Sequence, residues 1–207
     1  MTAAVPHIIA LEDMLAHPEY LSLREIPGLH LDLRYASDNN FIGHDLYGRF
    51  DGAYLHQQAA AQLQKAVALL AARKPDWRFR VLDALRPGRV QRVLWAKVAG
   101  TPEEIYVADP DKGSIHSFGM AIDITLDDED GNEVDMGTPF DDFTLLAHPA
   151  HEPTMLAEGR LSQAQLANRQ LLRDCLYGAG FHGIPAEWWH FDAADKHWIR
   201  QHLALVE

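Results

Sequence analysis

The chain has 207 residues, of which 47% are apolar, so residues 1–207 can bury one hydrophobic core as a single domain. Its formal net charge of −12 argues against a protein that binds the phosphate backbone of nucleic acids. The only cysteine, Cys175, excludes an internal disulfide, and no apolar stretch approaches the ~20 residues that cross a membrane. The N-terminal residues also lack the pattern of a secretion signal, so we expect a cytoplasmic protein without nucleic-acid or membrane partners.

The first half of the chain predicts two strands and two helices. Residues 31–35 and 78–85 alternate apolar and polar side chains, as strands with one buried face do. Residues 54–74 are rich in Ala, Leu and Gln and stop before Pro75, which predicts a helix. A second helix is expected over residues 90–99, after the stop that an Arg-Pro-Gly turn provides.

The second half of the chain is more irregular. The predicted segments are, in chain order, a loop over 100–113, a strand over 122–126, an irregular surface lid or loop over 139–159, a helix over 163–177 that ends at Gly178, a short aromatic segment over 181–192 and a helix over 194–203. Cys175 lies on the apolar face of a predicted helix and is expected to be a buried structural thiol. Because strands and helices interleave without a regular βαβ rhythm, we expect an α+β fold.

Spacing singles out candidate metal ligands among the twelve histidines. His116 and Asp123 are seven residues apart, whereas two ligands of one zinc ion lie within about 4 Å of each other. Seven residues span ~10.5 Å in a helix and ~23 Å in a strand, so the chain has to bend between them. Gly119 permits that bend, and the apolar neighbours of Asp123 indicate a buried carboxylate that needs a strong partner such as a metal.

A third ligand and a general base are expected from the segment Glu187-Trp188-Trp189-His190. In a straight strand, Glu187 and His190 would point to opposite faces because their spacing is odd. A turn after Pro185 or a local bulge would bring both side chains to the same side. The two tryptophans between them would then exclude water from the site.

Each of these segments is also compatible with a purely structural role. Taken alone, the segment around His116 is typical of a strand with a buried histidine, and the segment before His190 is typical of an aromatic core. Two competing histidine pairs are interpreted as solvated side chains, in a loop for one pair and on a surface helix for the other: His148 with His151, and His197 with His202.

Together, the two segments resemble a known pattern. The Ser-x-His-x-x-Gly-x-Ala-x-Asp run over 114–123 and the later Glu-x-x-His are similar to the zinc peptidases that include D-Ala-D-Ala carboxypeptidases and the L,D-endopeptidases of phage lysins. Further segments resemble more narrowly the D-alanyl-D-alanine dipeptidases of the vancomycin-resistance type: residues 32–36, 39–41, 83–87 and 135–141. The resemblance covers about residues 29–197, most of the chain.

The resemblance implies a fold, an activity and a set of site residues. The fold would be that of the M15 and Hedgehog-like zinc peptidases, one domain with a central, mainly antiparallel sheet flanked by helices. The activity would be hydrolysis of the small dipeptide D-alanyl-D-alanine to two D-alanine molecules by a zinc-activated water. The implied roles are zinc ligand for His116, Asp123 and His190, general base for Glu187, transition-state stabilisation for Arg86, and substrate contacts for Tyr35, Ser114 and Asp141.

Several of these residues are also compatible with roles outside the reaction. Arg86 could form a surface salt bridge, Tyr35 could be a core tyrosine, and Ser114 could cap the bend at His116. Asp142 is adjacent to Asp141 and competes for the same role. Leu85 stands where the family commonly has an aromatic residue, and the run around Ile115 and Phe118 also departs from the resistance enzymes; both bear on substrate preference. The rival functions are a peptidoglycan D,D-carboxypeptidase or L,D-endopeptidase, and a zinc-bearing binding domain without turnover.

Overall fold

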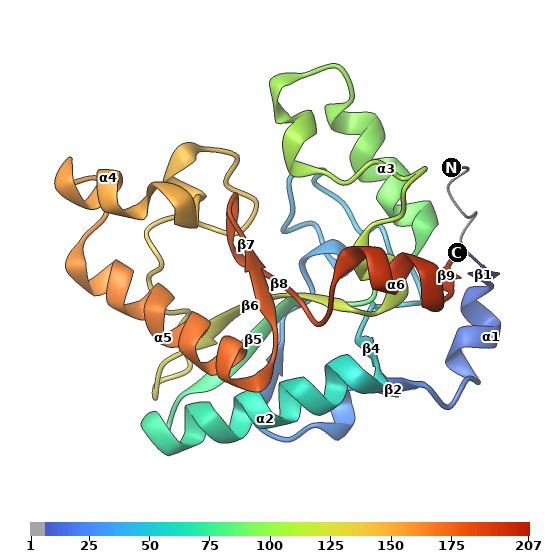
Figure 1. Cartoon of the computed structure of the whole chain (residues 1–207), viewed down its shortest axis with the longest axis horizontal. Helices are drawn as coiled ribbons and strands as arrows, with labels where there is room; N and C mark the ends of the chain where they lie inside the picture. Colours follow the sequence, from blue (N-terminus) through green and yellow to red (C-terminus); the bar gives the residue numbers. More distant parts are fainter. Residues whose placement is uncertain (1–6) are drawn as a thin grey trace.

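A five-stranded sheet forms the centre of the protein, which a computed structural model describes over residues 7–207 (Figure 1). The strand order is β3-β5-β6-β8-β7, and only the pair β3 and β5 is parallel. The strands are β3 (Leu29–Leu31), β5 (Arg78–Asp83), β6 (Ala121–Asp127), β7 (His182–Ile184) and β8 (Glu187–Asp192). The α+β class expected from the sequence is therefore confirmed, and the sheet is mainly antiparallel.

Two long helices, α2 (Gln57–Arg73) and α5 (Gln163–Ala179), lie side by side against the sheet (Figure 1). In α2, the buried side chains recur at helical spacing, so one stripe of the helix packs on the core: Ala59, Leu63, Ala66 and Leu70. α5 begins with a capping box at Ser162. Cys175 is buried on α5, as predicted.

Shorter elements complete the described chain. The helices are α1 (Leu11–Leu15), α3 (Gly88–Val98), α4 (Glu152–Ala157) and α6 (Lys196–His202). Two small strand pairs are β1 (Ile8–Ile9) with β9 (Leu205–Val206), which is parallel, and β2 (Tyr20–Ser22) with β4 (Tyr54–His56), which is antiparallel. One buried apolar cluster joins residues from Met14 to Val206. None of the helices in residues 7–207 has the length and apolarity that a membrane crossing requires.

Several predicted boundaries were wrong. The strand expected over 31–35 ends at Leu31, and a 3-10 turn over Arg34–Ala36 follows, because the neighbouring strand β5 provides its last backbone contact to Asp32. The helix expected from residue 54 begins at Gln57, since residues 54–56 pair with β2 instead. The helix predicted to end at Gly178 continues to Ala179 and ends at Gly180, whose φ of 104° suits glycine.

The segments expected to be irregular contain more regular structure than predicted. The loop over 100–113 includes a 3-10 turn (Pro102–Tyr106), and the lid over 139–159 includes α4. The remaining helices and strands lie within a few residues of their predicted positions, with α3 beginning at Gly88 and α6 at Lys196. The central strands and the loops that join them bring the candidate residues together around one cavity.

Candidate active site

Sheet register brings the first two candidate ligands together. Asp123 on β6 pairs directly with His190 on β8, and on the other side it pairs with Asp83 on β5. Neighbouring residues in an antiparallel pair lie about 5 Å apart, so the Asp123 and His190 side chains meet without any further distortion. Both are buried among apolar strand residues. This confirms the expectation that Asp123 is an interior carboxylate in need of a partner.

The third candidate ligand, His116, reaches the same point through a tight turn. It lies in a 3-10 helix (Ile115–Phe118) that ends at Gly119, whose φ is +66°. A Cβ atom at Gly119 would lie 2.9 Å from the backbone nitrogen of His56, so a side chain would disturb the loop as well as the backbone angle. The bend between His116 and Asp123 predicted from their spacing is therefore present, at the predicted glycine.

A bulge in the β7–β8 pair lets the side chains of Glu187 and His190 point to the same side of the strand. The pairing steps from Gly183 with Phe191 to Ile184 with Glu187, which leaves three residues of β8 out of register. Glu187 Oε2 consequently lies 3.9 Å from His190 Nδ1. The local bulge required by their odd spacing is observed.

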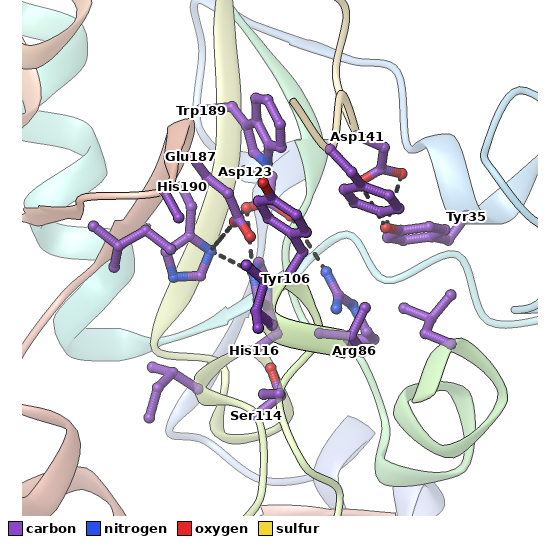
Figure 2. Close-up of a pocket in the computed structure, with 18 of the residues that line it drawn as sticks. Tyr35, Arg86, Tyr106, Ser114, His116, Asp123, Asp141, Glu187, Trp189 and His190 are labelled. Atoms are coloured by element: carbon purple, nitrogen blue, oxygen red, sulfur yellow. Dashed lines mark hydrogen bonds and ion pairs between the residues drawn. The ribbon is translucent and has the colours of Figure 1, made fainter. Parts of the chain in front are cut away.

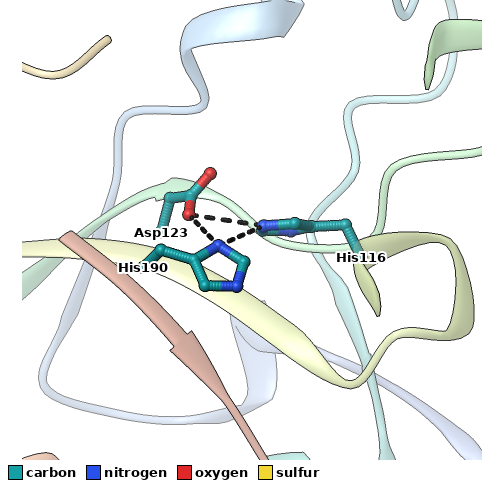
Figure 3. A group of neighbouring side chains, drawn as sticks. All are labelled: His116, Asp123 and His190. Carbon is teal, nitrogen blue, oxygen red and sulfur yellow. Dashed lines mark hydrogen bonds and ion pairs between the residues drawn. The ribbon is translucent and has the colours of Figure 1, made fainter. Parts of the chain in front are cut away.

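The three candidate ligands form a compact triangle (Figure 3). His116 Nε2 lies 3.2 Å from His190 Nδ1 and 3.3 Å from Asp123 Oδ1, and the last two atoms are 3.0 Å apart. Two ligands of a tetrahedral zinc ion, each ~2.0–2.1 Å from the metal, lie about 3.3 Å from each other. The three side chains can therefore hold one small metal ion.

Each of the two histidines of the triangle uses one ring nitrogen for a hydrogen bond outside the triangle, and its other ring nitrogen is available to a metal. His116 Nδ1 lies 2.7 Å from the carbonyl oxygen of Ala84, and a donor is required there, so Nε2 carries the lone pair. His190 Nε2 lies 2.9 Å from Asp192 Oδ1, which leaves Nδ1 as the ligand atom. Burial opposes a charge on His190, but the charges of Asp192 and Asp123 outweigh it and raise the pKa of His190 to about 10. A cation at this point is thus favoured, whether proton or metal.

Arg86 is buried and faces the triangle (Figure 2). Its Nη2 atom lies 3.3 Å from Asp123 Oδ2, while Nε donates to Asp83 at 2.8 Å and Nη1 to Gln91 at 3.0 Å. The ring of Tyr35 lies 4.9 Å from the guanidinium carbon. The alternative of a surface salt bridge is therefore wrong: Arg86 is fixed in the interior and can stabilise a negative charge that develops near the triangle.

Glu187 lies beside the triangle and lines the same cavity as Trp189 (Figure 2). Burial raises the pKa of Glu187 to about 7, and the positive charge of His190 only partly offsets this. A carboxyl group whose pKa lies near neutrality can both accept and donate a proton during a reaction. Glu187 is therefore the candidate general acid–base of this site.

Asp141 and Tyr35 form the other side of the site. The Tyr35 hydroxyl lies 3.1 and 3.0 Å from the two carboxylate oxygens of Asp141. Burial and the nearby charge of Asp123 raise the pKa of Asp141 well above its usual range, which means that an unbalanced negative charge there is unfavourable. Asp142 points elsewhere, because its carboxylate accepts from the backbone of Thr144 at 2.9 Å. The two adjacent aspartates thus have different surroundings, and only Asp141 lines the cavity with Tyr35.

A buried arginine fastens the segment that carries Asp141. Arg169 on α5 is fully buried, and its guanidinium donates to the carbonyl oxygens of Met136 at 2.7 Å and Leu146 at 3.1 Å. These two carbonyls lie five residues before and five residues after Asp141. Arg169 also pairs with Glu152 at 3.3 Å. Residues 136–146 are therefore held at both ends by one side chain, and Asp141 between them has a φ of +58°.

Replacing Arg169 by Met is expected to lower the free energy of unfolding by about 2–4 kcal/mol, because two carbonyl groups lose their donor. Arg173→Met provides the matched control, since Arg173 is partly exposed and its guanidinium pairs, within residues 7–207, with Glu152 alone. Denaturant unfolding of both variants measures the difference. An equal loss of stability in the two variants would show that the backbone contacts of Arg169 contribute little.

The candidate residues line one cavity of about 260 Å³. This is smaller than the ~300–1,000 Å³ pockets that take drug-sized ligands, so it suits a small molecule. All eight residues proposed from the sequence contribute to its lining: Tyr35, Arg86, Ser114, His116, Asp123, Asp141, Glu187 and His190. Ser114 occupies the cap position of its 3-10 helix but makes no capping hydrogen bond, so the capping alternative is wrong.

Some residues of the site were not predicted from the sequence. Tyr106 lines the cavity, and its hydroxyl lies 2.8 Å from Nε2 of His148. His148 was expected to be solvated but is buried, because this contact and a ring contact with Tyr106 cover it. No signal in the sequence connects two loops that are 42 residues apart. The partner of His190 could have been found, because Asp192 is two residues away on the same strand and shares its face.

Comparison with known proteins agrees with this geometry. The profile of the peptidase M15 family, described as D-ala-D-ala dipeptidase, matches residues 17–206. The chain belongs to this family. It is 37% identical to the D-alanyl-D-alanine dipeptidase of Escherichia coli (strain K12) over 166 residues, which cover 80% of this chain and 79% of that protein. It is 32% identical to the D-alanyl-D-alanine dipeptidase of Enterococcus faecium over 192 residues, 83% of this chain and 89% of that protein.

Membership of the M15 family confirms the resemblance seen in the sequence. The protein is therefore a hydrolase of the peptidase class, and the alternative of a binding domain without turnover is not supported. A peptidase needs an activated water, a base and a stabilised oxyanion. This M15 chain has a triangle of candidate metal ligands, a carboxyl group beside it and a buried arginine facing it.

Proposed function

We propose that this M15 peptidase hydrolyses D-alanyl-D-alanine with one zinc ion held by His116, Asp123 and His190. The observation that carries the proposal is the triangle of ligand atoms, 3.0–3.3 Å apart, at the base of a small cavity. Two imidazoles and one carboxylate suit zinc, and three protein ligands are typical of catalytic rather than structural zinc sites. The names of the relatives support the same substrate.

The chain's own side chains supply the remaining chemistry. When bound, the zinc ion supplies a Lewis acid that makes water a nucleophile at neutral pH. Glu187 accepts the proton of the attacking water and then donates it to the leaving amine. Arg86, fixed by Asp83 and Gln91, stabilises the oxyanion that develops on the scissile carbonyl group. The peptide bond between the two residues breaks, and two molecules of D-alanine result.

Asp141 would bind the free ammonium group of the dipeptide. Its carboxylate is partly buried, accepts from Tyr35 and forms no ion pair within residues 7–207, so a substrate ammonium would balance its charge. The segment that carries Asp141 is fastened by Arg169, and we propose that this fixed segment excludes a residue before the dipeptide. This arrangement favours a dipeptidase over a carboxypeptidase or endopeptidase that acts on longer peptidoglycan peptides.

Three further features extend the proposal. One continuous apolar core supports a single domain over residues 1–207. The mainly antiparallel sheet with ligands on β6 and β8 supports the Hedgehog-like variant of the fold. The cytoplasmic location remains a prediction from the sequence.

The test is a comparison of three substrates with the zinc-loaded protein. D-Ala-D-Ala is expected to be cleaved well, and L-Ala-L-Ala and N-acetyl-D-Ala-D-Ala poorly. The acetylated compound lacks the ammonium charge and adds bulk on the side of Asp141. If the acetylated compound is cleaved at the rate of the free dipeptide, the result favours a carboxypeptidase over a dipeptidase.

The role of Asp141 is tested by Asp141→Asn, which keeps the shape and tolerates the same backbone conformation. We expect the specificity constant kcat/KM for D-Ala-D-Ala to fall by the equivalent of about 2–5 kcal/mol, the range for breaking a buried charge pair. Asp142→Asn is the matched control and should have a much smaller effect, because Asp142 does not line the cavity. Equal losses in both variants would remove Asp141 from the proposed site.

A further inference from the structure

The cavity contains one cation that has no anionic partner. Three long cationic side chains contribute to its lining: Arg86, Lys196 and Arg200. Arg86 pairs with two aspartates, and Lys196 Nζ lies 3.3 Å from Asp192 Oδ2. Within residues 7–207, no carboxylate lies at ion-pair distance from Arg200. A positive charge at the wall of a small cavity is thus available to a ligand.

The guanidinium of Arg200 is anchored but not saturated. α6 packs against the 3-10 helix that carries His116, and Arg200 Nη2 donates to the carbonyl oxygen of Gly113 at 3.0 Å. Its Nε atom is buried without a hydrogen-bond partner. Its Nη1 atom is not buried and has no partner among the described residues. A guanidinium has five N–H donors in a fixed fork, so most of them remain free.

Ser114 adds a second free donor at the same place. It directly follows Gly113, and the residue is only 5% exposed, yet its side chain makes no hydrogen bond within the described chain. In Figure 2, Ser114 lies at the bottom of the group of site residues, next to His116, whereas Asp141 lies at the upper right, beside Tyr35. The cavity therefore has an acidic end at Asp141 and a donor-rich, cationic end at Ser114 and Arg200.

We propose that Arg200, with Ser114, binds the C-terminal carboxylate of the substrate. This inference rests on the proposed function, in which the substrate is a free dipeptide with one charged group at each end. A carboxylate accepts two parallel hydrogen bonds from a guanidinium, and such charge-assisted bonds are the strong ones. With the ammonium at Asp141 and the carboxylate at Arg200, both charged ends of the dipeptide are recognised. The distance between the two ends of the cavity then sets the substrate length at two residues.

The experiment compares D-Ala-D-Ala with its C-terminal amide, which differs only in the charge of the carboxyl end. We expect the wild-type protein to prefer the acid over the amide by about 10- to 100-fold in kcat/KM, the range for hydrogen bonds to a charged group. Arg200→Gln keeps a donor for Gly113 but removes the charge. It should lose most of the preference through a higher KM for the acid, with little change for the amide.

Two further variants complete the design. Arg200→Lys keeps the charge and should retain part of the preference for the acid. Lys196→Met removes a cation that is already paired with Asp192, so it should retain the preference whatever its effect on rate. If Arg200→Gln keeps the full preference while the wild type cleaves D-Ala-D-Ala, the role of Arg200 is wrong and the proposed function stands. If the wild type cleaves neither compound, the proposed function itself fails, and the inference fails with it.

Discussion

Replacing Glu187 by Gln is expected to lower kcat for the dipeptide by about 10²–10⁴-fold while zinc remains bound. Gln has nearly the same shape, so the β7–β8 bulge and the contact with His190 are preserved. It cannot accept a proton from water, however, and it cannot donate one to the leaving amine. Steady-state kinetics together with metal content of the same preparation measure the two effects.

The matched control for this substitution is Glu152→Gln, which changes a buried carboxylate outside the cavity. Glu152 pairs with Arg169 and Arg173, so its loss should lower stability without removing the proton acceptor. A Glu187→Gln variant that turns over near the wild-type rate would mean that another group is the base. Loss of zinc from that variant would instead point to a structural role for Glu187.

Replacing any one of His116, Asp123 and His190 by Ala is expected to abolish zinc binding and activity together. The three ligand atoms lie within 4.8 Å of one another, and removal of one leaves only two protein ligands. Dialysis of the wild-type protein against a chelator should also remove zinc and activity. Added zinc should restore activity in the wild-type protein and not in the three variants. Metal analysis of each purified variant is the measurement.

Substitutions outside the triangle are expected to weaken zinc binding partly or not at all. Asp192→Asn removes the charged partner of His190 and should weaken zinc binding by about 10- to 100-fold without abolishing it. His148→Ala and His151→Ala should retain full zinc, because neither belongs to the cluster. Full occupancy in a variant of the triangle would remove that residue from the ligand set.

The close approach of His116 and Asp123 was predictable because its key constraint is local. The seven-residue spacing of His116 and Asp123 demands a bend, and Gly119 is the residue that allows it. The sequence predicted that the side chains of Glu187 and His190 must point to the same side, but it did not predict how the chain achieves this. Strand periodicity places them on opposite faces, and the bulge that overrides it depends on pairing with β7, which no local pattern encodes.

Other parts of the site depend on contacts between distant segments. Arg169 lies within a helix, where an arginine usually faces solvent, and only the position of the segment over 136–146 shows that it is buried. The burial of His148 depends in the same way on Tyr106. Tyr35 was expected in a strand because its segment alternates, but the alternation continues past the last partner residue of β5. Periodicity reports which side chains are apolar and does not report where a neighbouring strand ends.

The anchoring of residues 136–146 has a consequence for how molecules enter and leave. That segment cannot swing outward without separating the guanidinium of Arg169 from Glu152 and from two backbone carbonyls. The neighbouring part of the cavity lining includes a 3-10 turn (Pro102–Tyr106) with no buried residue, in which Ile105 is 78% exposed and the Tyr106 ring stacks on Phe143. We therefore expect the dipeptide to enter the cavity, and alanine to leave it, beside this turn. A proline or disulfide that stiffened it would slow exit of the products rather than the bond-breaking step.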